Sequence, residues 1–117
     1  MIALPEGAAL ADYQRYIHEL EALHGWLDND LVHNCFLMGE EMGELFKAVR
    51  RQLRYYDENA ASTAQDDAES AARKAHVAEE LVDVLNYLLA IANRLEIDME
   101  AAFKAKNALN QQRSWQK

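Results

Sequence analysis

The 117-residue chain has little of what β-sheets, disulfide-stabilised folds and membrane spans require. One proline and four glycines leave few of the turn residues that separate short strands. The single cysteine, Cys35, cannot form an intramolecular disulfide, so we expect a reducing, cytoplasmic location. We find no signal-peptide pattern, and the longest apolar stretch, 81–92, contains Asp83 and Asn86 and is too short to span a bilayer.

Positive charge is also scarce, since 12 Lys and Arg stand against 20 Asp and Glu and give a net charge of -8. This excess of negative charge disfavours nucleic acid and anionic membranes, and we expect neither as a partner. A phosphorylated small molecule stays compatible with it, because a bound metal ion can reverse the local field. The length allows one domain, and we expect residues 1–117 to form it.

Apolar residues recur at three- and four-residue spacing and predict four helices. The expected ranges are 8–23, 31–55, 68–95 and 99–112. Gly25 should end the first helix and Asp98 should cap the last, whereas the polar segment 57–67 is predicted to be a loop. These elements predict an all-α fold, an antiparallel four-helix bundle-like domain. The third helix is apolar around roughly half its circumference, which is wider than a single partner helix can cover. We therefore expect a homodimer or homotetramer to complete the bundle.

Two features of the second helix are predicted to be structural. Cys35 lies in its apolar stripe and should be a buried small hydrophobe. Four basic residues follow further along the same helix and should form a solvated face that pairs with neighbouring acids. They are Lys47, Arg50, Arg51 and Arg54.

Two pairs of acids lie in helical stretches that contain no Lys or Arg. Glu41 and Glu44 form one pair, and Glu80 and Asp83 form the other. At three-residue spacing both members of a pair lie on one side of a helix turn, and antiparallel packing could bring all four carboxylates together. Such a group repels itself unless a cation neutralises it, and Mg²⁺ prefers oxygen ligands. The pairs therefore fit a metal site for phosphate chemistry, but they also fit ordinary solvated acids on helix surfaces.

Two other classes of function remain open on the residues alone. A di-iron carboxylate bundle also gathers acids between helices, but it needs two E-x-x-H motifs, and only Glu21 and His24 form one. A non-catalytic helical interaction module would need no metal, and its acids could be replaced without loss of function.

The acidic pairs belong to longer segments that resemble a known family. The segments are GEEMGELFKAV at 39–49, AEELVDVLNYL at 78–88 and IDMEAAF at 97–103. A K-x-x-x-N-x-x-R element follows at Lys106, Asn110 and Arg113. In this order they resemble the MazG-type all-α nucleotide pyrophosphohydrolases over roughly residues 20–115. The segment between the pairs, 45–79, is longer than the family usually shows.

The resemblance implies hydrolysis of a nucleoside triphosphate, canonical or deoxy, to a monophosphate and pyrophosphate, as nucleotide-pool housecleaning. Phosphoribosyl-ATP is the alternative substrate within the family. The implied ligands of Mg²⁺, which Mn²⁺ could replace, are Glu41, Glu44, Glu80 and Asp83. The implied catalytic residues are Glu40 and Glu41, and Glu40 would orient or deprotonate a water molecule or else face solvent. The implied substrate contacts are Tyr87, Lys106, Asn110 and Arg113.

Overall fold

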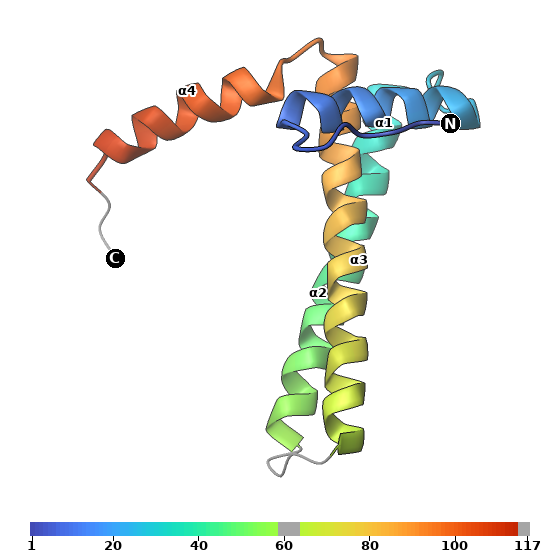
Figure 1. The fold of residues 1–117 in the computed structure, drawn as a ribbon, viewed down its shortest axis with the longest axis vertical. Helices are drawn as coiled ribbons and strands as arrows, with labels where there is room; N and C mark the ends of the chain where they lie inside the picture. The colour runs from blue at the N-terminus through green and yellow to red at the C-terminus, as the bar shows by residue number, and fades with distance from the viewer. Residues whose placement is uncertain (59–63, 115–117) are drawn as a thin grey trace. The chain divides into compact units, whose positions relative to one another are not determined.

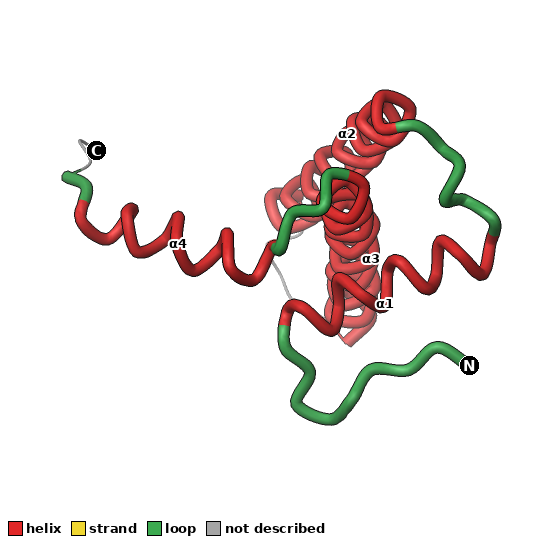
Figure 2. Tube along the Cα trace, turned by 90° about the horizontal axis from the view of Figure 1, so that it is seen from above, coloured by secondary structure: helices red, strands yellow, loops and turns green. Residues whose placement is uncertain are grey.

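The structure, a computed structural model, describes residues 1–58 and 64–114. Its helices are α1 (Leu10–His24), α2 (Leu31–Glu58), α3 (Ala64–Arg94) and α4 (Met99–Gln112) (Figure 1). Within the described ranges the regular elements are all helices, joined by loops (Figure 2). The all-α prediction is therefore confirmed. None of the described helices combines the length and apolar character that a membrane span needs.

The predicted loop at 57–67 is wrong at both ends. α2 continues to Glu58 and α3 already begins at Ala64, while residues 59–63 lie outside the described part of the chain. The segment contains no glycine or proline, and alanine and glutamine near its end favour helix, so its composition allows both helices to extend into the predicted loop. Its polar composition, which predicted a loop, is equally typical of the solvated face of a helix.

The chain divides into two compact units. The first, called the terminal unit below, comprises Met1–Leu31 and Leu89–Lys117. The second, the hairpin unit, comprises Val32–Leu88, in which α2 and α3 run antiparallel and side by side (Figure 1). A single domain over residues 1–117 stays a prediction.

The terminal unit is built where α1 packs on the last turns of α3. Ile17, Leu89 and Ala90 are buried there. The partly buried residues packed against them are Leu10, Tyr16, Leu20 and Met99. Gln14 of α1 fixes the turn between α3 and α4, because its amide donates to the Ile97 carbonyl at 2.7 Å. The three helices of this unit are thus held together by a small apolar core and by polar contacts from α1.

A buried ion pair joins α1 to α3 in the same unit. Arg94 donates to both carboxylate oxygens of Glu21, at 3.1 Å and 2.6 Å. It also donates to the backbone carbonyls of Trp26 and Asn29, both at 3.0 Å. The two side chains are only 14% and 8% exposed, respectively. Arg94 therefore anchors the α1–α2 loop as well as α1 itself.

The helix ends follow the predicted signals, with one exception. Gly25 ends α1 with φ 72°, and the next amide, of Trp26, donates to the Glu21 carbonyl at 2.8 Å. Asp98 caps α4, because its carboxylate accepts from the Ala101 amide at 3.1 Å. Both predictions are confirmed. α3 ends in the same left-handed way as α1, but the residue there is Glu96 with φ 55°, where glycine would be unstrained.

The seam between α2 and α3 combines apolar and polar side chains. Among the described side chains of α2 in the hairpin unit, the buried or half-buried ones are Asn34, Leu37, Met38, Glu41, Leu45, Ala48 and Gln52. Those of α3 within the hairpin unit are Ser70, Arg73, Val77, Glu80, Asp83, Val84, Asn86 and Tyr87. Cys35 lies off this line and is exposed, so the prediction that it is buried is wrong for the single chain. The helices pair through a face that is partly polar, and this places charged groups between them.

Candidate metal centre

The α2–α3 seam brings acids from both predicted pairs together. Glu41 lies on the α2 side of the seam, and Glu80 and Asp83 lie on the α3 side, one helical turn apart. One carboxylate oxygen from each of the three lies within 4.8 Å of the others. All three residues belong to the hairpin unit, so the pairing of two antiparallel helices is sufficient to form the group.

Burial and the neighbouring carboxylates perturb the pKa of Glu41. The pKa of Glu41 is raised above its ordinary value of 4.5, mainly because burial disfavours the charged form. The negative charges of Asp83 and Glu80 raise it further, as does a hydrogen bond with Glu80. The group thus holds more negative charge than its protein surroundings neutralise.

Glu80 is the most buried of the three converging acids. Its side chain is 13% exposed, and its Oε2 atom is buried without a hydrogen-bond partner among the described residues. The other oxygen, Oε1, lies 3.7 Å from Nε2 of His76, one turn earlier on α3. A buried carboxylate oxygen without a donor is costly, and a cation would satisfy it.

These observations fit a divalent metal ion. Three carboxylates from two helices converge, as hard cations with oxygen ligands require. The raised pKa of Glu41 and the buried free oxygen of Glu80 both indicate uncompensated negative charge at the point of convergence. The arrangement can therefore hold a metal ion with Glu41, Glu80 and Asp83 as ligands.

The remaining residues predicted near the metal lie at its edge. Glu44 is exposed and is not one of the three converging acids, although its charge contributes to the raised pKa of Glu41. Glu40 is exposed on α2. Tyr87 is half-buried one turn after Asp83, on the seam side of α3. Metal binding by Glu44, catalysis by Glu40 and substrate contact by Tyr87 stay predictions.

The predicted substrate contacts of α4 belong to the terminal unit. Lys106 is exposed, and Asn110 is half-buried with its amide donating to the Asn107 side chain at 3.1 Å. Arg113 is the C-cap residue of α4, and its backbone amide donates to the Asn110 carbonyl at 3.3 Å. These three residues share the C-terminal part of one helix, and their role in substrate binding stays a prediction.

Sequence reasoning missed His76 as a neighbour of the acidic group. Its ring nitrogens lie 3.7 Å from Glu80 and 3.8 Å from Glu79. The signal was present, because residues three and four apart on a helix are neighbours. His76 was missed because the candidate ligands were acids at three-residue spacing, although His76 lies inside the predicted helix 68–95, one turn before Glu80.

Comparison with known proteins assigns the family. The family model described as MazG nucleotide pyrophosphohydrolase domain matches residues 34–114. The chain belongs to this family. Its domain is accordingly a nucleotide pyrophosphohydrolase, and the prediction made from the ordered motifs is confirmed. The match spans both acidic pairs and the K-x-x-x-N-x-x-R element of the MazG domain. No curated protein and no solved structure matches the chain.

Proposed function

We propose that this MazG protein is a Mg²⁺-dependent nucleoside triphosphate pyrophosphohydrolase. In the proposed reaction, water adds to the α-phosphorus of a ribo- or deoxyribonucleoside triphosphate. The bond from that phosphorus to the bridging oxygen breaks, pyrophosphate leaves with the bonding electron pair, and a proton is released. The observation that carries the proposal is the convergence of Glu41, Glu80 and Asp83 within 4.8 Å in a chain of this family.

The acids of the seam would hold the metal ion. Glu41, Glu80 and Asp83 are the proposed ligands, and Glu44, one turn from Glu41, would complete the set. A bound Mg²⁺ would supply charge neutralisation of the phosphates and acidification of water. Glu40 would accept the proton of the attacking water, with Glu41 fixing the geometry as a ligand. Mn²⁺ presents similar preferences for carboxylate ligands and could replace Mg²⁺.

Substrate contacts would come from residues beyond the acids. Lys106 and Arg113 of the α4 region carry the positive charge that phosphate groups require, and Asn110 can donate hydrogen bonds between them. Tyr87 offers a half-buried ring beside the metal group for the sugar or base. Removal of aberrant or excess nucleotides in the cytoplasm, a housecleaning role, is the physiological function that we infer.

A homodimer, or a tetramer built from it, is part of the proposal. Large apolar side chains of the hairpin unit are exposed in the single chain, including Phe36 at 70% and Phe46 at 62%. The others are Val32, Met42, Val49 and Leu53 of α2 and Leu81, Val82, Leu85 and Leu88 of α3. Soluble monomers rarely leave such a concentration of apolar surface uncovered. A second copy would also bury the wide apolar surface of α3.

Pyrophosphate release tests the proposed reaction. Purified protein is incubated with canonical, deoxy and damaged nucleoside triphosphates and with phosphoribosyl-ATP, and added pyrophosphatase converts the product to measurable phosphate. We expect turnover with Mg²⁺, none with EDTA, and loss of turnover in the Asp83→Asn variant. The matched control is Glu79→Gln, which removes an exposed carboxylate beside the group.

Three results would contradict the proposal. Full turnover in EDTA or in the Asp83→Asn variant would remove the metal assignment. Release of single phosphates without added pyrophosphatase would change the bond that is broken. Turnover restricted to phosphoribosyl-ATP would replace the substrate and leave the metal centre in place.

A further inference from the structure

A basic cavity lies between α2 and α3 beside the acidic group. It has a volume of about 510 Å³, within the range of roughly 300–1,000 Å³ that small-molecule sites occupy. Its lining residues are Ala48 and Arg51 of α2 and Glu69, Ala72, Arg73 and His76 of α3. Two alanines on facing helices leave the space, and two arginines outnumber the single carboxylate on its wall. The cavity is therefore suited to an anion.

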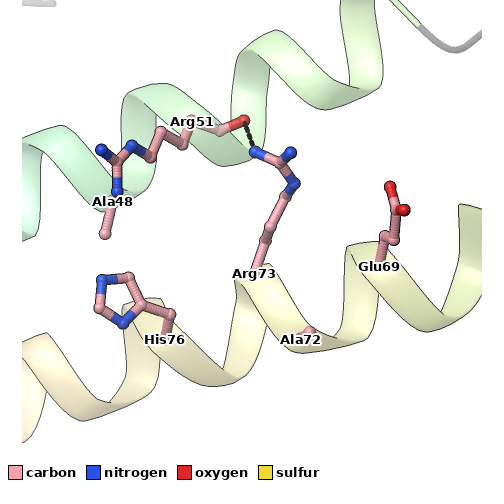
Figure 3. Close-up of a pocket in the computed structure, with 6 residues that line it drawn as sticks. All are labelled: Ala48, Arg51, Glu69, Ala72, Arg73 and His76. Carbon is pink, nitrogen blue, oxygen red and sulfur yellow. Dashed lines mark hydrogen bonds between the residues drawn. The ribbon is translucent and has the colours of Figure 1, made fainter.

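The charged side chains of this cavity project into the space between the helices. Arg73, His76 and Glu69 extend from α3 toward α2, and Arg51 extends from α2 (Figure 3). Arg73 is held in place because its Nη1 donates to the backbone carbonyl of Arg51 at 3.3 Å. The structure records no ion pair for the Arg51 side chain among the described residues.

His76 connects the cavity to the candidate metal centre. The same imidazole that lines the cavity has its Nε2 atom 3.7 Å from Oε1 of Glu80. A ligand that reaches from the carboxylates past His76 would thus pass from a metal-binding group to two guanidinium groups. Guanidinium groups bind phosphate oxygens through paired, charge-assisted hydrogen bonds.

We propose that the cavity at Arg51 and Arg73 is a subsite for the pyrophosphate part of the nucleotide. This assignment rests on the proposed triphosphate substrate, of which it names the portion that is bound here. Pyrophosphate fits the site better than a nucleobase, because the wall presents cationic hydrogen-bond donors and His76 is its one aromatic ring. The two arginines would bind the pyrophosphate leaving group and would offset the negative charge that it gains as it departs.

Pyrophosphate binding measured by isothermal titration calorimetry tests the subsite. The probe is sodium pyrophosphate, added at constant ionic strength with magnesium chloride and, separately, with EDTA. Arg51→Gln and Arg73→Gln each remove one charged donor group from the cavity. The matched controls are Arg50→Gln and Lys74→Gln, which remove the same charge from adjacent, exposed positions outside the lining.

We expect at least about tenfold weaker pyrophosphate binding in each cavity variant, because each loses hydrogen bonds to a charged group. The two controls should bind as the wild type does. Arg51→Gln keeps the backbone carbonyl that Arg73 uses, so it tests the cavity even if Arg73→Gln lowers stability. Equal binding in all four variants, or no binding of pyrophosphate by the wild type, would overturn the subsite.

The outcomes for the subsite and for the proposed function are separable. If no nucleotide is hydrolysed but pyrophosphate binding still depends on Arg51 and Arg73, the reaction is wrong and the subsite stands. If nucleotides are hydrolysed and Asp83→Asn is inactive, while Arg51→Gln and Arg73→Gln bind pyrophosphate normally, the reaction stands and the subsite is wrong.

Discussion

Replacing Glu80 with glutamine should make the metal-free protein more stable and abolish its stabilisation by Mg²⁺. Glu80 interacts with two other carboxylates whose nearest oxygens lie within 4.8 Å. Two like charges at this distance repel by about 1 kcal/mol in water and by about 3.5 kcal/mol at an effective dielectric constant of about 20. Glu41 already relieves part of this repulsion through its raised pKa, so the lower part of the range applies. We expect a gain of about 1–3 kcal/mol in the free energy of unfolding.

Thermal unfolding measures both effects at one protein concentration, because an oligomer would make the midpoint depend on concentration. In EDTA the Glu80→Gln variant should melt at least about 4 °C above the wild type. Saturating Mg²⁺ should stabilise the wild type by about 2.7 kcal/mol at one hundred times its dissociation constant. The variant should show little or none of this increase, since it lacks one of the three converging ligands.

Glu79→Gln is the control for the loss of a carboxylate at a neighbouring position. Its side chain is 76% exposed and contacts only His76 among the recorded ion pairs of the described residues. This variant should melt as the wild type does in EDTA and should keep the full response to Mg²⁺. A Glu80→Gln protein that melts lower than the wild type in EDTA and still responds to Mg²⁺ would refute the repulsion argument and the metal centre together.

Four further predictions concern the buried ion pair, the left-handed residue at the end of α3, pH and assembly. Arg94→Gln leaves the carboxylate of Glu21 buried without its partner, so the free energy of unfolding measured in urea should fall by about 3–5 kcal/mol. Glu96→Gly removes a strained left-handed residue and should raise the same free energy by up to about 1 kcal/mol. A more stable Arg94→Gln protein, or a less stable Glu96→Gly protein, would contradict the prediction for that residue. The pKa of Glu41 is raised in the folded protein, so its contribution to stability falls as pH rises from 4.5 through that pKa. In EDTA the stability of the Glu41→Gln variant should therefore increase relative to the wild type over this pH range. A stability difference that does not change with pH would refute the raised pKa of Glu41. Phe46→Glu should convert the proposed dimer to a monomer in light scattering, and an unchanged mass would exclude Phe46 from the interface.

The helices and their ends were predictable because their signals are local. Gly25 and Asp98 act within one turn of the helix ends that they set, through a left-handed φ and a side-chain cap. The end of α3 lacks a glycine signal in the sequence, because Glu96 takes the left-handed conformation that glycine usually supplies. The loop at 57–67 was predicted too long, since polar residues do not distinguish a loop from an exposed helix.

The candidate site was predictable in composition but not in its surroundings. The family motifs identified Glu41, Glu80 and Asp83, and helical spacing explains why the two acids of α3 act from one side. The basic cavity was not predicted, because Arg51 and Arg73 meet only through the register of two antiparallel helices. Single-helix reasoning assigned Arg51 to a solvated face, and Arg51 is exposed, but that reasoning could not place it beside Arg73.

The same register leaves part of the apolar surface of α3 uncovered. Leu81, Leu85 and Leu88 recur at three- and four-residue spacing, and each of these is exposed in the single chain. The α2–α3 seam instead contains buried Ala48 and the converging acids Glu41, Glu80 and Asp83. A helix that uses one face for charged groups must bury its apolar face elsewhere. The exposed apolar face of α3 accompanies this register, and it provides the surface on which the proposed second copy would pack.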